Sequence, residues 1–229
     1  MPYTTHESEE SVVLEPAATA DAAVIWLHGL GADGYDFVPI VAELRLPPTM
    51  AVRFIFPHAR PRPVTINNGF VMRAWYDITG LGADRKEDDP GIRESANVVN
   101  GYIEQQNASG VATERIVLAG FSQGGAIALQ ASLRYPKRLG GVMALSTYLP
   151  LQGSVAAEAA PANKDLPILM CHGLRDPMIA AAIGKASRDQ LVSLGYTVEW
   201  QSYPMEHQVC MEEVLDISRW LQARLGVKS

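Results

Sequence analysis

The sequence has few of the residue types that mark disulfide-rich or nucleic-acid-binding proteins. Only two of its 229 residues are cysteines, Cys171 and Cys210, which is too few for a disulfide framework. Its 19 Lys and Arg residues are outnumbered by 25 Asp and Glu residues, giving a formal net charge of −6. Basic residues never occur in runs longer than two. This charge balance argues against nucleic acid as a partner.

Long apolar runs are also missing, which excludes a membrane-spanning helix. The segment 6–10 is polar and acidic, and it lacks the basic and apolar regions of a signal peptide. We therefore expect a cytoplasmic protein that does not span a membrane. Hydrophobic residues make up 48% of the chain and charged residues 19%, so there is ample material for a buried core.

Short apolar runs alternate with helical patterns along the chain. Strands are predicted at residues 11–14, 22–27, 50–56, 115–119, 141–146, 166–172 and 197–203. Helical patterns cover residues 36–45, 92–107, 125–131, 179–194 and 207–225. This alternation predicts an α/β fold, with a mainly parallel sheet covered by helices on both faces. We expect a single domain over residues 1–229, in which residues 1–10 form a mobile tail.

Three segments lack a regular pattern. Residues 57–69 hold prolines, asparagines and a glycine, which predicts a loop. Residues 77–91 are rich in glycine and charge and predict a long surface loop, and loops of this length are often functional. Residues 152–164 are rich in alanine and polar residues and predict an irregular segment.

A tight strand–turn–helix is predicted around Ser122. The pentapeptide Gly120-Phe121-Ser122-Gln123-Gly124 follows an apolar β-branched run and precedes a run of small helix formers. This is the context of a nucleophile elbow, in which the central serine adopts a strained conformation and its flanking glycines leave space for the turn. Ser122 is therefore the best candidate for a nucleophile.

A catalytic serine needs a base, and the base needs an acid that orients it. In parallel-sheet hydrolases these partners follow the serine in the order acid, then histidine, in loops after later strands. Asp176 follows the strand at 166–172 and precedes a proline. Asp165 and Asp189 are weaker candidates, because the first precedes that strand and the second lies in a helical pattern.

His207 is the best candidate for the base, because it follows the last predicted strand. His28 precedes the elbow and His172 precedes the acid, so both are in the wrong order. His6 and His58 lie in the tail and in the proline-containing loop. The histidines and cysteines show no metal-ligand spacing, so we expect no metal. A Cys210–His207 nucleophilic pair is rejected, since the elbow already provides a nucleophile.

Acyl transfer also needs backbone N–H groups that bind the developing oxyanion. One donor in such folds is the residue after the nucleophile, here Gln123. The other comes from a loop after an early strand, here residues 28–34, whose three glycines let a ligand approach the backbone. We expect Leu30 to supply this second N–H. A phosphate cradle is a weaker interpretation of this loop, because the P-loop Lys-Ser/Thr pair is missing.

Several short motifs together resemble the carboxylesterase and acyl-protein thioesterase family, and its bacterial carboxylesterases most of all. In chain order these motifs are His28-Gly29-Leu30-Gly31-Ala32-Asp33-Gly34, Arg62-Pro63-Val64-Thr65, Trp75-Tyr76-Asp77, Gly120-Phe121-Ser122-Gln123-Gly124-Gly125-Ala126, Leu145-Ser146 and His172-Gly173-x-x-Asp176-Pro177. The resemblance covers about residues 12–225.

The resemblance implies an α/β-hydrolase fold, a Ser122–His207–Asp176 triad, an oxyanion hole from Leu30 and Gln123, and no cofactor. It also suggests a homodimer. The stretch from Trp75 to Leu81 would form part of the acyl pocket and its flap. Residues equivalent to Met178 and Ile179 line the substrate groove in the family.

Two departures from the family pattern concern the surroundings of the triad. Glu206 stands before His207, where the family usually has glycine, and a carboxylate there could raise the basicity of the histidine or point into solvent. Met178, Ile179 and Ala180 replace the usual Val-Val-Pro after the acid motif. These differences bear on substrate preference and leave the triad intact.

We expect a serine carboxylesterase that hydrolyses carboxylic esters, with thioesters as a further substrate class, through an acyl-Ser122 intermediate. Its partner would be a small ester or thioester, or an acylated protein. One alternative is an acyl-protein thioesterase or lysophospholipase that acts on long acyl chains. The other is a catalytically silent relative that only binds a ligand, since a fold alone does not guarantee chemistry.

Overall fold

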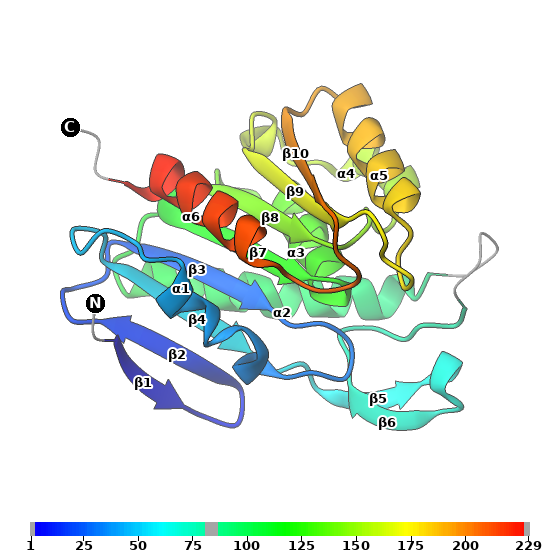
Figure 1. Cartoon of the computed structure of the whole chain (residues 1–229), viewed down its shortest axis with the longest axis horizontal. Helices are drawn as coiled ribbons and strands as arrows, with labels where there is room; N and C mark the ends of the chain where they lie inside the picture. Colours follow the sequence, from blue (N-terminus) through cyan, green and yellow to red (C-terminus); the bar gives the residue numbers. More distant parts are fainter. Residues whose placement is uncertain (1–2, 81–86, 227–229) are drawn as a thin grey trace.

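The computed structural model describes residues 3–80 and 87–226, and an eight-stranded sheet runs through this part of the chain (Figure 1). In spatial order the strands are β1 (Tyr3–Glu7), β2 (Ser11–Pro16), β4 (Val52–Pro57), β3 (Ala22–Leu27), β7 (Ile116–Phe121), β8 (Gly141–Leu145), β9 (Ile168–Gly173) and β10 (Val198–Tyr203). The six strands from β4 to β10 are parallel, whereas β1 and β2 are antiparallel to their neighbours. The predicted α/β fold with a mainly parallel sheet is confirmed.

Helices cover both faces of the sheet, as Figure 1 shows. One face packs against α2 (Asp89–Ala108), α3 (Gln123–Arg134), α4 (Val155–Glu158) and α5 (Ala181–Ser193). The other packs against α1 (Ile40–Glu43) and α6 (Met211–Leu225). Short 3-10 turns are η1 (Gly34–Phe37), η2 (Thr65–Asn67), η3 (Thr113–Arg115), η4 (Gln152–Ser154) and η5 (Pro161–Asn163). Within the described residues, no helix combines the length and the apolar character needed to cross a bilayer.

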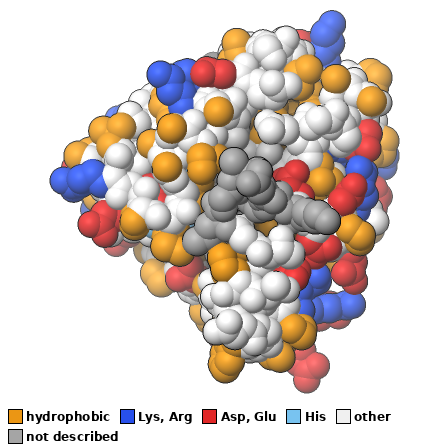
Figure 2. Space-filling model, turned by 90° about the vertical axis from the view of Figure 1, so that its right-hand side faces the viewer, with side chains coloured by type: hydrophobic (Ala, Val, Ile, Leu, Met, Phe, Trp, Pro, Cys, Tyr) orange, Lys and Arg blue, Asp and Glu red, His pale blue; other side chains and the backbone are white. Residues whose placement is uncertain are grey.

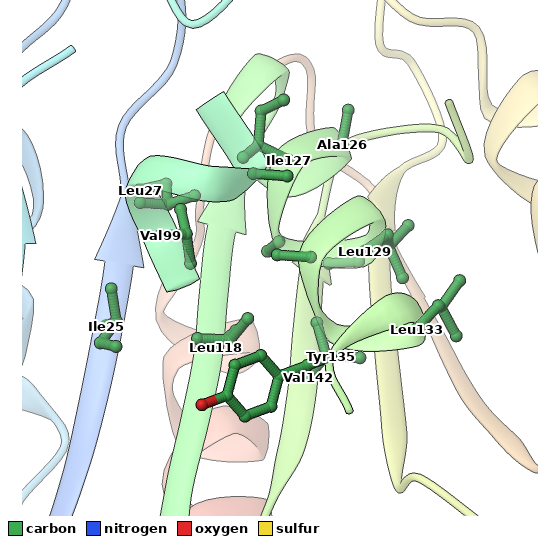
Figure 3. Close-up of a cluster of buried hydrophobic side chains, with 14 of the residues drawn as sticks. Ile25, Leu27, Val99, Leu118, Ala126, Ile127, Leu129, Leu133, Tyr135 and Val142 are labelled. Atoms are coloured by element: carbon green, nitrogen blue, oxygen red, sulfur yellow. The ribbon is translucent and has the colours of Figure 1, made fainter. Parts of the chain in front are cut away.

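The central strands are buried on both faces, which explains their continuous apolar runs. In β3, Ile25 and Leu27 pack into the core beneath α2 and α3, whereas Val24 and Trp26 pack into the core on the opposite side, where Trp26 stacks on Phe37 of η1. Figure 3 shows side chains of α3 lying against those of β3, β7 and β8. This packing fixes α3 on the sheet, and α3 starts at the predicted elbow.

Two segments that were expected to lack regular structure form strands. Residues 3–7 pair with β2 as an edge strand, so this segment does not form the mobile tail that was predicted over residues 1–10. β1 is mostly exposed and is held by backbone pairing and by an edge contact between Tyr3 and Phe54. The proline-containing loop forms the hairpin of β5 (Pro61–Val64) and β6 (Phe70–Arg73). Pro61 and Pro63 lie two residues apart in β5, so the positions without an N–H group face the same side of the strand. An edge strand tolerates this, because that side needs no hydrogen-bonded neighbour.

The last helix begins at Met211, four residues later than its sequence pattern predicts, because residues 204–210 form a loop after β10. His207 therefore lies on a loop at the carboxyl edge of the sheet. Residues 152–164, expected to be irregular, contain only the short α4 and the turns η4 and η5.

A buried carboxyl group lies in the first turn of α6. Glu213 is completely inaccessible to solvent. Burial raises the pKa of Glu213 to about 8, and the charge of nearby Asp216 adds to this effect. The side chain is therefore neutral in the folded protein over most of the physiological pH range, since burial disfavours its ionised form.

We predict that Glu213→Gln stabilises the protein increasingly as the pH rises. In an unfolded chain the pKa of glutamic acid is roughly 4.3. Between this value and about 8 the folded protein retains a proton that the unfolded chain has lost, so wild-type stability falls with pH across this window and then levels off. In urea unfolding, the free energy of unfolding of the variant relative to the wild type should be larger at pH 8.5 than at pH 5 by a few kcal/mol. Glu212→Gln, at the exposed neighbouring position, is the control. The account would be contradicted if Glu213→Gln raised the free energy of unfolding by the same amount at both pH values.

Candidate active site

The turn between β7 and α3 has the strained geometry of a nucleophile elbow. Ser122 lies between the two elements with φ 52° and ψ −120°, a conformation that L-residues rarely adopt. A Cβ on Gly120 would lie 2.3 Å from the Gly124 carbonyl group, and one on Gly124 would lie 2.5 Å from the carbonyl oxygens of Leu27 and His28. The two glycines therefore let the chain turn sharply and let α3 start directly against the end of β3.

The parallel register brings the loops that carry the predicted site residues to one edge of the sheet. Leu27 pairs with Gly120, which places the loop after β3 beside the elbow. Tyr203 pairs with Gly173, which places the loop after β10 beside the loop after β9. The predicted nucleophile, base and acid thus come from neighbouring strand ends.

Ser122, His207 and Asp176 form a continuous hydrogen-bonded relay. His207 Nε2 lies 2.9 Å from Ser122 Oγ, and His207 Nδ1 lies 2.6 Å from Asp176 Oδ2. Since a carboxylate accepts, Nδ1 carries the ring proton and donates to Asp176, which leaves the Nε2 lone pair directed at the serine hydroxyl. The His207 ring also packs against the Phe121 ring, with centroids 4.7 Å apart.

Asp176 is held in place by its own loop. Its side chain is completely buried, and Oδ1 accepts hydrogen bonds from the backbone N–H groups of Met178 and Ile179, both at 2.8 Å. One oxygen is thus oriented by the loop while the other faces His207.

His172, which was rejected as the base, also contacts Asp176. Burial lowers the pKa of its ring, which favours the neutral form. Its Nε2 donates to the Ile179 carbonyl oxygen at 2.8 Å and lies 3.5 Å from Asp176 Oδ2. His172 therefore ties β9 to the loop that orients Asp176. The sequence gives no direct signal for this contact, because His172 and Ile179 meet only when the loop folds back.

Two backbone N–H groups are positioned to bind an oxyanion. Among the described residues, neither Leu30 N nor Gln123 N has a hydrogen-bond partner. Both residues line the same cleft as Ser122. Gln123 is the first residue of α3, and the partial positive charge at a helix N-terminus favours an anion there.

A cleft of about 470 Å³ opens beside Ser122 and His207. Its walls are largely apolar and include Ile78, Met178, Ile179 and Ile183. Figure 2 shows the molecule from the side toward which the parallel strands run, and hydrophobic side chains lie across this face while most Lys and Arg side chains lie toward its margins. The cleft is large enough for an acyl chain and offers apolar contacts to it.

The four residues predicted to bind substrate have different positions. Met178 and Ile179 line the cleft. Trp75 does not: its side chain is 2% exposed, and its indole N–H donates to the His28 carbonyl oxygen at 2.9 Å. Its neighbour Tyr76 lines the cleft instead. Leu81 lies outside the described residues.

Sequence interpretation missed other residues of the cleft wall. Tyr76 and Tyr148 meet through their hydroxyl groups at 2.6 Å, and Ile183 in the first turn of α5 also lines the cleft. Tyr76 lies in the stretch from Trp75 to Leu81 that the resemblance assigned to the acyl pocket, so only its individual contribution was missed. Tyr148 and Ile183 carried no such signal.

The remaining candidate groups play no part in the relay. Glu206 is exposed. Cys210 is partly exposed, and burial raises the pKa of its thiol, which leaves the reactive thiolate disfavoured. In the described part of the chain, no three His, Cys, Asp or Glu side chains are grouped so that they could hold a metal ion.

The sequence profile of the phospholipase/carboxylesterase family matches residues 8–225. The chain belongs to this family. It is therefore a serine hydrolase of ester or thioester substrates with the α/β-hydrolase fold. Among proteins of similar sequence, an acyl-protein thioesterase 1 from Gibberella zeae is 39% identical, over 95% of this chain and 97% of the relative. A protein of the same name from Neurospora crassa is 39% identical, over 93% and 91% of the two chains.

Solved structures of similar proteins superpose well on this hydrolase. Arabidopsis thaliana SOBER1 is 34% identical with a TM-score of 0.85, over 89% of this chain and 99% of the other. Zea mays acyl-protein thioesterase 2 is 31% identical with a TM-score of 0.85, over 94% and 99% of the two chains. A Bacillus cereus carboxylesterase, at 18% identity and a TM-score of 0.76, shares the fold over 95% of each chain.

We predict that Gly124→Ala strongly destabilises this hydrolase. The added methyl group would lie 2.5 Å from two backbone carbonyl oxygens of β3 and the residue after it, so the strand or α3 must shift. Urea unfolding should show that the free energy of unfolding falls by about 3 kcal/mol or more. Gly101→Ala, in α2 with open space around it, is the matched control and should be neutral or stabilising by up to about 1 kcal/mol. Equal stability of the two variants would contradict the proposed constraint.

Proposed function

We propose that Ser122 is the nucleophile, His207 the general base and Asp176 the residue that orients and stabilises the base. The observation that carries this proposal is the partly buried relay of 2.9 Å and 2.6 Å contacts that ends at a serine in an elbow. His207 Nε2 takes the hydroxyl proton as Oγ attacks the carbonyl carbon. The negative charge that forms on the carbonyl oxygen is stabilised by the N–H groups of Leu30 and Gln123.

The tetrahedral intermediate collapses when the bond to the leaving oxygen or sulfur breaks. His207 returns its proton to that atom, which leaves as an alcohol or thiol and leaves an acyl group on Ser122. A water molecule then gives a proton to His207 and attacks the acyl carbon, and the same N–H groups bind the second oxyanion. Collapse releases the carboxylic acid and restores the serine hydroxyl. The sequence-based alternative of a silent binding protein is set aside, because the family and its relatives support an enzyme.

Long-chain acyl esters and thioesters, including those of acylated proteins, are the substrate class that we favour. The cleft next to Ser122 has an apolar wall made by Met178, Ile179 and Ile183. A wall of this kind stabilises an alkyl chain by removing it from water. The sequence relatives named acyl-protein thioesterase 1 support the same class. The cytoplasmic location and the homodimer stay predictions from the sequence.

We predict that Ser122→Ala abolishes hydrolysis of short p-nitrophenyl esters while the fold is retained. Removal of Oγ leaves no atom to form the acyl-enzyme, so kcat should fall by roughly a factor of 10⁴ or more. The assay pairs initial rates with circular dichroism of the same samples. Ser193→Ala, at an exposed position in α5, is the control and should match the wild type. Turnover by folded Ser122→Ala at more than a few per cent of the wild-type rate would overturn the assignment.

We predict that Met178→Ser shifts substrate preference toward short chains. Met178 is 57% exposed in the cleft wall and is free to cover an acyl chain. Its apolar contact is worth on the order of 1 kcal/mol, so kcat/KM for a dodecanoyl ester should fall about 5- to 10-fold, while the value for an acetyl ester should change less than about 2-fold. Met211→Ser, similarly exposed on α6, controls for the loss of a surface methionine. An equal fall for both esters would exclude Met178 as an acyl contact.

A further inference from the structure

The amide side chain of Gln123 is fully committed to hydrogen bonds with one neighbouring segment. Gln123 is 2% exposed. Its Oε1 accepts from Trp75 N–H at 2.8 Å, and its Nε2 donates to the Tyr76 carbonyl oxygen at 2.7 Å. The residue whose backbone N–H is the expected oxyanion donor thus fastens the elbow to the cleft wall 47 residues earlier.

Trp75 extends this connection to the second oxyanion loop. Its indole N–H donates to the His28 carbonyl oxygen at 2.9 Å, and the Trp75 and His28 rings lie 5.2 Å apart. Its own carbonyl oxygen accepts from the Ser95 hydroxyl on α2. All the polar groups of Trp75 are therefore used to fix its position between the elbow and the residue that precedes Gly29 and Leu30.

The His28 ring fixes the start of the same loop. Its Nε2 accepts from Ala59 N–H at 3.0 Å, so Nδ1 carries the proton and donates to the Gly29 carbonyl oxygen at 2.7 Å. Burial lowers the pKa of the ring to about 4, which keeps it neutral and preserves this arrangement. The peptide group between Gly29 and Leu30, whose N–H is the other expected donor, is therefore held through its carbonyl oxygen.

We propose that Gln123, Trp75 and His28 are positioning residues that set the spacing of the two oxyanion donors. Together they connect Gln123 N–H to Leu30 N–H through side-chain hydrogen bonds. This inference rests on the oxyanion hole of the proposed function and goes beyond it, because it assigns the spacing to side chains outside the triad. Preorganised donors stabilise a transition state only when they are fixed before charge develops.

Gln123→Met and Trp75→Phe test the proposal on the full-length enzyme. The first variant keeps the backbone N–H and side-chain size but removes both amide hydrogen bonds, and the second removes only the indole N–H and part of the ring. A complete oxyanion donor is worth roughly 10²–10³ in rate, so a displaced donor should lower kcat for a p-nitrophenyl ester by about 10- to 100-fold. KM should change less than about 3-fold, because the cleft wall is retained.

Matched controls separate this effect from a general loss of packing. Gln130→Met lies on the same helix, where Gln130 is 1% exposed and its amide oxygen has no partner among the described residues. Trp220→Phe removes a buried indole N–H that likewise has no described partner, on α6. Both controls should keep wild-type kcat. The double variant Gln123→Met/Trp75→Phe should lose no more than about 3-fold beyond the worse single variant, since both residues act through one connection.

Several results would overturn the proposal. These are kcat within about 3-fold of wild type in either folded variant, a rise in KM with unchanged kcat, or equal losses in the controls. If Gln123→Met does not fold, Trp75→Phe decides alone. An inactive Ser122→Ala combined with wild-type kcat in the two variants rejects only this inference, whereas an active Ser122→Ala rejects the proposed function itself.

Discussion

The close contact between the start of α3 and the end of β3 is the constraint on which the site depends. Gly124 lies so near the Leu27 and His28 carbonyl oxygens that a side chain there would collide with them. This contact brings the strained Ser122 and the first N–H of α3 beside the loop that carries Leu30. The parallel register of β9 and β10 then places the loops of Asp176 and His207 at the same edge. The positions of the proposed nucleophile, base, acid and oxyanion donors thus follow from backbone packing.

The sequence predicted the parts of the molecule that are determined locally. The run at 22–27 is continuous because β3 is buried on both faces, and its pattern therefore predicted a buried strand without further information. The elbow was recognisable because glycines are needed where two backbones meet. Asp176 and His207 were predicted from their order after later strands, and their hydrogen bonds with each other and Ser122 agree with that order.

Contacts between distant segments were not predictable from the residues alone. β1 is held by backbone pairing and carries no apolar pattern, so it was expected to be mobile. Trp75 was predicted as a substrate contact because the resemblance assigned its stretch to the acyl pocket. In the structure its indole N–H donates a hydrogen bond to the carbonyl oxygen of His28, which is distant in the sequence. The hydrogen bonds of the Gln123 side chain were not predicted for the same reason, because its partners lie 47 and 48 residues away.

Active-site labelling tests the central claim most directly, namely that Ser122 Oγ is the atom that receives the acyl group. The enzyme is treated with a fluorophosphonate, whose phosphorus is attacked by the serine oxygen with loss of fluoride. Residual esterase activity is then measured, and the adduct is counted by intact mass and located by peptide mapping. The account predicts one adduct per chain, located on Ser122, with activity lost in proportion to its formation and no adduct in Ser122→Ala. Complete loss of activity with the adduct on another residue, or full Ser122 labelling with activity retained, would contradict it.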